Sequence, residues 1–320
     1  MRPIEIFNGV MVCAALAGAT LVMGMGRVER ADNSASYSES TELRFGTTAD
    51  GREALLDSTG EAIATGSYKR IVAGSIVARS ALGELSEKER IVGVISAGIQ
   101  DAPDAHRFTG IEQLKGMDET ERLIALNPDL IIVSSLSSVP HMRRLREAGI
   151  AVFILGDMRG VETFLRDIRQ IAVLLGAQKR GDRLANAYRR RMHGIAKLTP
   201  ARDRKEAIYL SAYGTTMFGG TSGTSYHDVL KFAGLIDAAS NHFSGWPQYT
   251  PEHVLSMDPE VIVSPHGVPE FVCNHSAMGR LQACANDRAG FVELPASWLE
   301  DPSLVMLDVA ESVHEAVYGD

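Results

Sequence analysis

Two stretches of this sequence share one pattern: ERLIALNPDLIIV at residues 121–133 and EHVLSMDPEVIV at residues 252–263. Each begins with a glutamate, continues through a short helical run, and breaks at Pro-Asp or Pro-Glu. Each then ends in an apolar run typical of a buried strand. The two stretches lie much farther apart than the repeats of a solenoid protein. The pattern therefore predicts two matching α/β lobes.

Apolar runs alternate with helical runs on both sides of these stretches. In the first half we predict strands at 70–74, 91–95, 130–133 and 151–155, and helices at 75–85, 118–126 and 142–148. In the second half we predict strands at 207–210 and 261–263, and helices at 227–232, 251–257 and 304–318. Such alternation is typical of parallel sheets covered by helices. A pair of short strands around a turn is also predicted within 55–63.

Residues 161–197 interrupt this alternation. They contain no proline, and apolar residues recur at helical spacing, with Gly176 as the weak point. If mostly continuous, one helix here spans about 50 Å, and its basic run from Lys179 to Arg191 is typical of a solvated face. We therefore predict an α/β fold of two Rossmann-like lobes joined by a long α-helix. The expected parts are a tether and lead-in hairpin at 31–69, an N-terminal α/β lobe at 70–160, a connecting helix at 161–197 and a C-terminal α/β lobe at 198–320.

The first thirty residues have a different character from the rest. Residues 9–26 carry no charge. The length of this uncharged stretch lies between that of a signal-peptide core and that of a membrane-spanning helix. We predict that residues 1–30 are a signal peptide or an N-terminal membrane anchor, which contacts the membrane at least transiently. A buried cytosolic helix is the less favoured alternative. The expected location is the periplasm or the extracytoplasmic face of the inner membrane.

Composition and cysteines narrow the function classes. The 320 residues are 45% hydrophobic and 22% charged, a globular mixture, and the net charge of −8 makes a nucleic-acid partner unexpected. Cys273 and Cys284 form either a disulfide or two free thiols, since spacing does not decide between them. No CxxC motif and no His/Glu set with zinc spacing is present, so neither a metal site nor a cofactor is predicted.

Candidate ligand-binding residues follow from the predicted sheets, because ligands of open α/β sheets lie beyond the carboxyl ends of the strands. Trp246 lies in a Gly-Trp-Pro loop, where its ring could stack on a planar ligand or instead pack on its own lobe. No nucleophile–base–acid arrangement is present, so we predict that the chain is not an enzyme. The candidate residues are Ser75, His106, Arg107, Phe108, Ser135, Tyr213, Phe218, Trp246, His266 and Trp298.

The order of these features resembles the periplasmic substrate-binding proteins of ABC importers for iron-siderophores, haem and vitamin B12. The resemblance runs from Arg70 to the C-terminus and includes both quoted stretches, the long helical segment, and Gly-Gly-Thr-Ser at 219–222 leading to 228–234. The segment 246–252 is most similar to that of the vitamin B12-binding members. Ser297, however, stands before Trp298 where those members carry an acidic residue.

This resemblance implies a function and a set of partners. The chain would capture a metal chelate (cobalamin, ferric siderophore or haem) in a cleft between the lobes and, as a monomer, deliver it to an ABC permease with its ATPase. Glu121 and Glu252 would dock on the permease, one from each lobe. Two other classes stay open: an enzyme on a similar two-lobed scaffold, such as a chelatase or an oxidoreductase component, and an anchored sensor or scaffold that has lost transport.

Overall fold

The structure is a computed structural model that describes residues 42–100, 102–299 and 302–319. The signal peptide or anchor expected at residues 1–30 lies outside the described residues. Within the described part of the chain, no helix is both long enough and apolar enough to cross a membrane.

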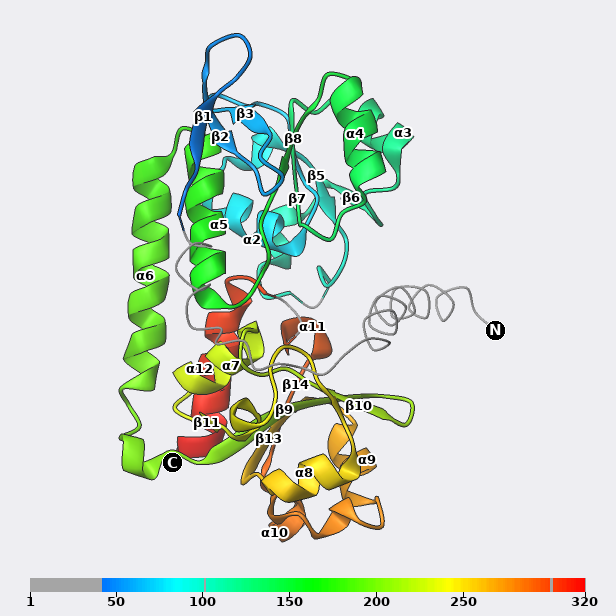
Figure 1. Cartoon of the computed structure of the whole chain (residues 1–320), viewed down its shortest axis with the longest axis vertical. Helices are drawn as coiled ribbons and strands as arrows, with labels where there is room; N and C mark the ends of the chain where they lie inside the picture. The colour runs from blue at the N-terminus through cyan, green and yellow to red at the C-terminus, as the bar shows by residue number, and fades with distance from the viewer. Residues whose placement is uncertain (1–41, 101, 300–301, 320) are drawn as a thin grey trace, which may run out of the picture. The chain divides into compact units, whose positions relative to one another are not determined.

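Five parallel strands form the sheet of the N-terminal lobe (Figure 1). In chain order they are β4 (Ile71–Ala73), β5 (Ile91–Ile95), β6 (Glu112–Leu114), β7 (Leu130–Val133) and β8 (Ala151–Ile154). The spatial order is β6-β5-β4-β7-β8, so the winding direction reverses between β4 and β7. Open sheets bind their ligands at such a reversal, beyond the carboxyl ends of the two strands.

Three helices cover this sheet, and the glycine that follows β4 allows close packing against β7. The helices are α2 (Ile76–Leu85), α3 (Thr120–Ala125) and α4 (Val139–Glu147), with 3-10 turns at η2 (Lys88–Arg90) and η3 (Ala105–Phe108). Ser75 caps α2, because its hydroxyl accepts a hydrogen bond from the Ala78 amide at 3.1 Å. Gly74 follows β4 directly, and a Cβ at this position would lie only 2.7 Å from the Val133 side chain.

A small antiparallel sheet precedes the N-terminal lobe. It contains β1 (Phe45–Thr47), β2 (Glu53–Leu56) and β3 (Ala62–Ala64), where the sequence predicted only two strands. The buried carboxylate of Asp57 accepts a hydrogen bond from Arg146 of α4 at 2.7 Å. The Ser58 amide donates to the Ile154 carbonyl at 2.9 Å. These contacts tie the small sheet to the lobe.

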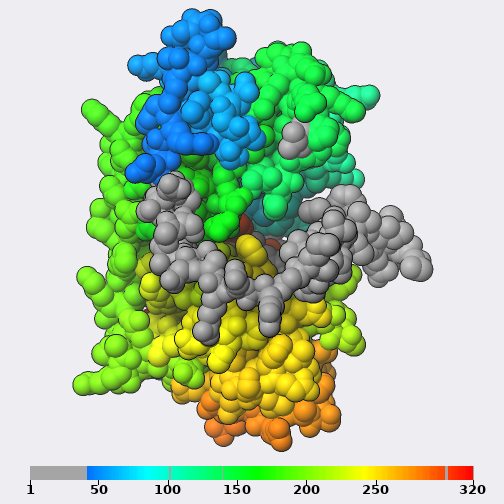
Figure 2. Space-filling view, in the orientation of Figure 1, coloured from blue at the N-terminus to red at the C-terminus, as the bar shows by residue number. Residues whose placement is uncertain are grey.

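The connecting segment differs from the single helix predicted over 161–197. It consists of α5 (Val161–Leu174) and α6 (Gln178–Ala196), which pack against each other. Gly176 adopts φ +68°, which ends α5 and reverses the chain. α6 also contacts α7 and α12 of the C-terminal lobe, and Figures 1 and 2 show it alongside both lobes. The helix that joins the lobes is therefore α6 alone, about 28 Å long at 1.5 Å per residue.

The C-terminal lobe contains a mixed sheet of six strands. They are β9 (Glu206–Tyr213), β10 (Thr216–Gly219), β11 (Ile236–Asp237), β12 (Gln248–Tyr249), β13 (Val261–Pro265) and β14 (Phe291–Leu294). Strands β9, β13, β14 and β11 are parallel, whereas β10 pairs antiparallel with both β9 and β12. The sequence did not predict β10, β11, β12 or β14.

Six helices complete this lobe. They are α7 (Ser225–Phe232), α8 (Pro251–Met257), α9 (Val268–Cys273), α10 (Ala285–Arg288), α11 (Ala296–Leu299) and α12 (Val305–Tyr318), with 3-10 turns at η4 (Ala201–Asp203), η5 (Ala238–Asn241), η6 (Met278–Arg280) and η7 (Gln282–Cys284). The predicted helix over 251–257 agrees with α8 at both ends.

The two lobes also touch outside the connecting helix. Asp228 of α7 accepts a hydrogen bond at 2.7 Å from the Val161 amide, so a carboxylate of the C-terminal lobe caps α5. Burial raises the pKa of Asp228 above its ordinary value. The Leu304 amide donates to the Ser80 hydroxyl of α2 at 3.2 Å. The predicted fold class, two α/β lobes joined by a helix, is confirmed.

Candidate ligand-binding site

Trp246 is an exposed aromatic residue on a fixed backbone. Its side chain is 62% exposed. On one side the Gly245 amide donates to the Ser222 carbonyl at 2.9 Å, and on the other the Gly219 amide donates to the Pro247 carbonyl at 2.8 Å. A large apolar ring on a backbone held from both sides can stack on a ligand without first losing loop entropy.

Two further aromatic candidates lie on the adjoining hairpin of the C-terminal lobe. Tyr213 ends β9 and is 56% exposed. Phe218 lies on β10, is half-buried, and pairs with Gln248 of β12 two residues after Trp246. The hairpin and the Trp246 loop thus belong to one antiparallel edge of the sheet. This edge carries the exposed rings of Tyr213 and Trp246.

The N-terminal lobe supplies an apolar side chain that the sequence analysis did not single out. Leu136, in the turn after β7, is 93% exposed, more than any other large hydrophobic residue that the structure describes. Ser135 beside it is also exposed, whereas Ser75, after β4, is buried with its hydroxyl engaged as the α2 cap. The available signal was a lone leucine in the run Ser134-Ser-Leu-Ser-Ser138, directly after a buried strand.

The loop around η3 divides between the surface and the core. His106 is exposed, and Arg107 pairs with Glu84 at 2.6 Å. Phe108 is only 1% exposed and packs in the main hydrophobic core, beside α2 at Gly83. The expectation of a ligand-binding Phe108 therefore does not fit its position, because a ring inside the core has no face left for a ligand.

The last two candidates lie near the carboxyl ends of β13 and β14. Trp298 on α11 lines a small apolar cavity with the stacked rings of Tyr209 and Tyr226, whose centroids are 3.9 Å apart. This cavity has room for about one water molecule, so it is far too small for a chelate. His266 is exposed, and its Nδ1 atom lies 3.6 Å from the Glu293 carboxylate. No three His, Cys, Asp or Glu side chains gather as a metal site in the described ranges.

The two glutamates that open the quoted stretches occupy matching positions. Glu121 is exposed in the first turn of α3, and Glu252 is exposed in the first turn of α8. A hydrogen bond from its own backbone amide, with another from the Thr250 hydroxyl, holds the pKa of Glu252 below its ordinary value. Glu252 is therefore an anion at neutral pH.

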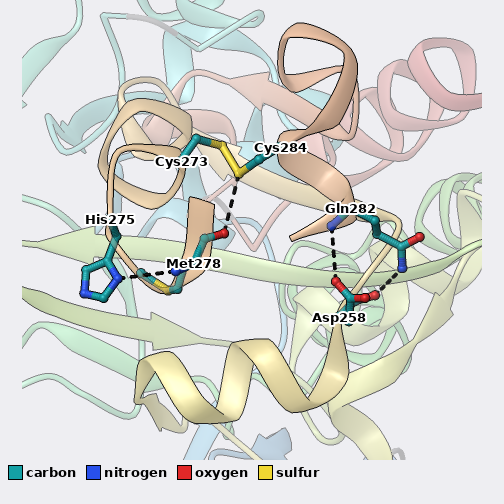
Figure 3. Close-up of a disulfide and its surroundings, with 6 residues drawn as sticks. All are labelled: Asp258, Cys273, His275, Met278, Gln282 and Cys284. Carbon is teal, nitrogen blue, oxygen red and sulfur yellow. Dashed lines mark hydrogen bonds between the residues drawn. A yellow bond between two sulfur atoms is a disulfide. The ribbon is translucent and has the colours of Figure 1, made fainter. Parts of the chain in front are cut away.

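Cys273 and Cys284 form a disulfide (Figure 3). The bond joins the end of α9 to η7 and closes residues 273–284 into what we call the disulfide loop. His275 and Met278 of this loop are linked, since the Met278 amide donates to His275 Nδ1 at 3.4 Å. Both alternatives left open by the sequence were compatible with the spacing, and the fold brings the two sulfur atoms together.

Comparison with known proteins identifies the family. The chain is 24% identical over 218 residues to an uncharacterised ABC transporter substrate-binding lipoprotein of Bacillus subtilis, covering 66% of this chain and 68% of that protein. It is 26% identical over 166 residues to the vitamin B12-binding protein of Salmonella paratyphi A, covering 50% of this chain and 60% of that protein.

A solved structure shows the same fold. The periplasmic haem-binding protein HutB of Vibrio cholerae matches with a TM-score of 0.68 at 19% identity, over 78% of this chain and 98% of that one. By their names, the first relative is a substrate-binding lipoprotein of an ABC transporter, the second binds vitamin B12, and the solved structure is a haem-binding protein. The sequence model of a protein family described as periplasmic binding protein matches residues 81–292 of this chain. The chain therefore belongs to the periplasmic binding protein family.

Proposed function

We propose that this chain is the extracytoplasmic solute-binding component of an ABC importer, which captures a metal chelate between its lobes and delivers it to the permease. The chelate class is cobalamin, ferric siderophore or haem. The observation that carries the proposal is Trp246, a ring 62% exposed on a backbone fixed by hydrogen bonds on both sides. A large apolar ring that is exposed in a binding protein is best explained by contact with a ligand that has an extended apolar face.

The remaining exposed side chains fit this proposal. Leu136 lies after β7, at the winding reversal of the N-terminal sheet, where open sheets bind ligands. Tyr213 adds a second ring from the C-terminal lobe. Together they would enclose a ligand through apolar contact from two lobes, and the single connecting helix α6 would limit how far the lobes move apart.

The experiment is a binding titration with cyanocobalamin, haem and ferrichrome, read by calorimetry and by thermal unfolding. The true ligand at 100 times its Kd should stabilise the chain by about 2.7 kcal/mol. Trp246→Ala should weaken that Kd about tenfold, since a buried aromatic contact contributes on the order of 1.5 kcal/mol. Phe45→Ala on β1 is the matched control, because its ring is 65% exposed and lies outside both lobes.

Two results would count against this function. The first is the absence of any shift with all three chelates. The second is equal chelate affinity for Trp246→Ala and Phe45→Ala. Binding without uptake, in cells that also carry the permease, would instead favour the sensor or scaffold alternative.

A further inference from the structure

The disulfide loop lies along α8, the helix that carries Glu252. At one end of α8, the Gln282 amide donates to the Asp258 carboxylate at 3.2 Å, and the Gln282 side chain also donates to the Asp258 carbonyl (Figure 3). Between the two segments, Met278 packs in one buried cluster with Val254 and Met257 of α8. The loop and α8 therefore form one rigid unit.

Figure 3 shows His275 of the disulfide loop toward the other end of α8, whose first turn carries Glu252. His275 is partly exposed to solvent, and Glu252 is exposed.

The hydrogen bonds of His275 determine its tautomer. Its Nδ1 atom accepts from the Ala277 amide at 3.2 Å and from the Met278 amide at 3.4 Å. A ring nitrogen that accepts carries no proton, so the neutral ring has its proton on Nε2. Nε2 has no partner among the described residues, and it is thus a hydrogen-bond donor available to another molecule.

From this arrangement we infer that the disulfide loop is part of the permease-docking surface, with His275 Nε2–H as a second contact beside Glu252. The inference rests on the proposed function. The partner surface that fits has a cationic side chain opposite Glu252 and, beside it, a carbonyl or carboxylate oxygen that accepts from His275. The disulfide holds the His275 donor and the Glu252 carboxylate at a fixed separation. No loop therefore has to become ordered when the protein docks.

Two substitutions of His275 separate contact from loop structure. His275→Asn keeps an acceptor at the Nδ1 position, and hence the turn, but removes the Nε2 donor. His275→Gln places a donor at the Nε2 position. The protein is bound to nanodiscs holding a permease that gives chelate uptake with the wild-type chain, and affinity is measured by biolayer interferometry. His193→Asn on exposed α6 surface is the control.

The expected result is an approximately fivefold weaker complex for His275→Asn, the effect of losing one hydrogen bond. His275→Gln and His193→Asn should stay within twofold of wild type. The Cys273→Ser/Cys284→Ser double variant should weaken the complex at least as much as His275→Asn. Chelate affinity should remain unchanged in every variant, which shows that the lobes are folded.

Wild-type permease affinity for both His275→Asn and the double cysteine variant would overturn the inference and leave the proposed function intact. A wild-type chain that binds chelate but forms no complex with any permease would remove both delivery and the inference.

Discussion

The two lobes hold their matching helices, α3 and α8, by different physical means. α3 has six residues, no side-chain N-cap, and one buried residue, Leu123. On its surface, Arg122 forms an ion pair with Glu119 at 2.8 Å and another with Glu112. α8 has a capping box between Thr250 and His253, two buried residues, and the disulfide loop beside it.

Under the proposed function, this difference would make Glu252 a preformed contact with the permease and Glu121 an adaptable one. Exposed ion pairs like those of Arg122 contribute little to stability and weaken with salt. A disulfide closing a loop of this size contributes about 3 kcal/mol in the chain-entropy model. Glu252 is therefore held in place before a partner arrives, whereas Glu121 lies on a helix that can adjust. One fixed and one adjustable contact would tolerate small changes in the angle between the lobes.

The largest expected effect concerns the two glutamates themselves. The double variant Glu121→Ala/Glu252→Ala should lower chelate uptake at least a hundredfold, because each lost charged contact costs about 1.5–3 kcal/mol. Glu252→Ala should be the more harmful single change, since its helix needs no ordering on docking. Uptake of labelled chelate in cells measures both. Glu315→Ala on α12, also an exposed glutamate, is the control. Equal uptake for the double variant and wild type would contradict docking through these residues.

A smaller effect is expected from removing the disulfide. The Cys273→Ser/Cys284→Ser variant should lose about 3 kcal/mol of unfolding free energy in the C-terminal lobe. Amide hydrogen exchange should accelerate in α8 while α3 exchanges as in wild type. Denaturant unfolding and exchange mass spectrometry test this. If exchange in α8 were unaffected, the core contacts of Val254 and Met257 would suffice to hold the helix, and the contrast between the lobes would lose its main cause.

The smallest effect is expected in α3. Arg122→Ala should lower the unfolding free energy only slightly, because the Arg122 side chain is exposed and water screens both of its ion pairs. The Arg122 side chain holds the pKa of Glu119 below its ordinary value of 4.5. A lowered folded-state pKa stabilises the protein above 4.5, and this contribution is lost as the pH falls through the lowered value. The effect of Arg122→Ala should therefore shrink on acidification and at 0.5 M salt.

Denaturant titrations at pH 7 and pH 3, each at low and high salt, measure this difference. A loss of several kcal/mol that is insensitive to salt would mean that Arg122 packs as well as pairs, and that α3 is as firmly held as α8.

Local signals predicted much of the fold correctly. The apolar runs became β4, β7, β8 and β13, and the helix predicted at 75–85 became α2, with Ser75 as its cap. The predicted connecting helix was wrong in one respect, since the chain reverses at Gly176. Helical periodicity continues across that glycine, and only the packing of α5 against α6 shows that the two runs are separate helices.

The candidate site was predicted less completely. Trp246 and Tyr213 are exposed as a ligand-binding role requires, whereas Phe108 lies in the core. All three are aromatic residues in or beside loops, so their sequence contexts look alike. Leu136 was not singled out within the candidate segment 134–141, because an apolar residue in a short loop is usually covered by another element, and its exposure depends on neighbours distant in the chain.

The sequence by itself determined the two α/β lobes, their order, and the matching positions of Glu121 and Glu252, because hydrophobic periodicity and helix boundaries are local properties. Only the tertiary structure decided which aromatic rings stay exposed, that α5 and α6 pack as a pair, and that Cys273 meets Cys284. Burial and disulfide geometry depend on contacts between residues far apart in the chain, and no local pattern encodes those contacts.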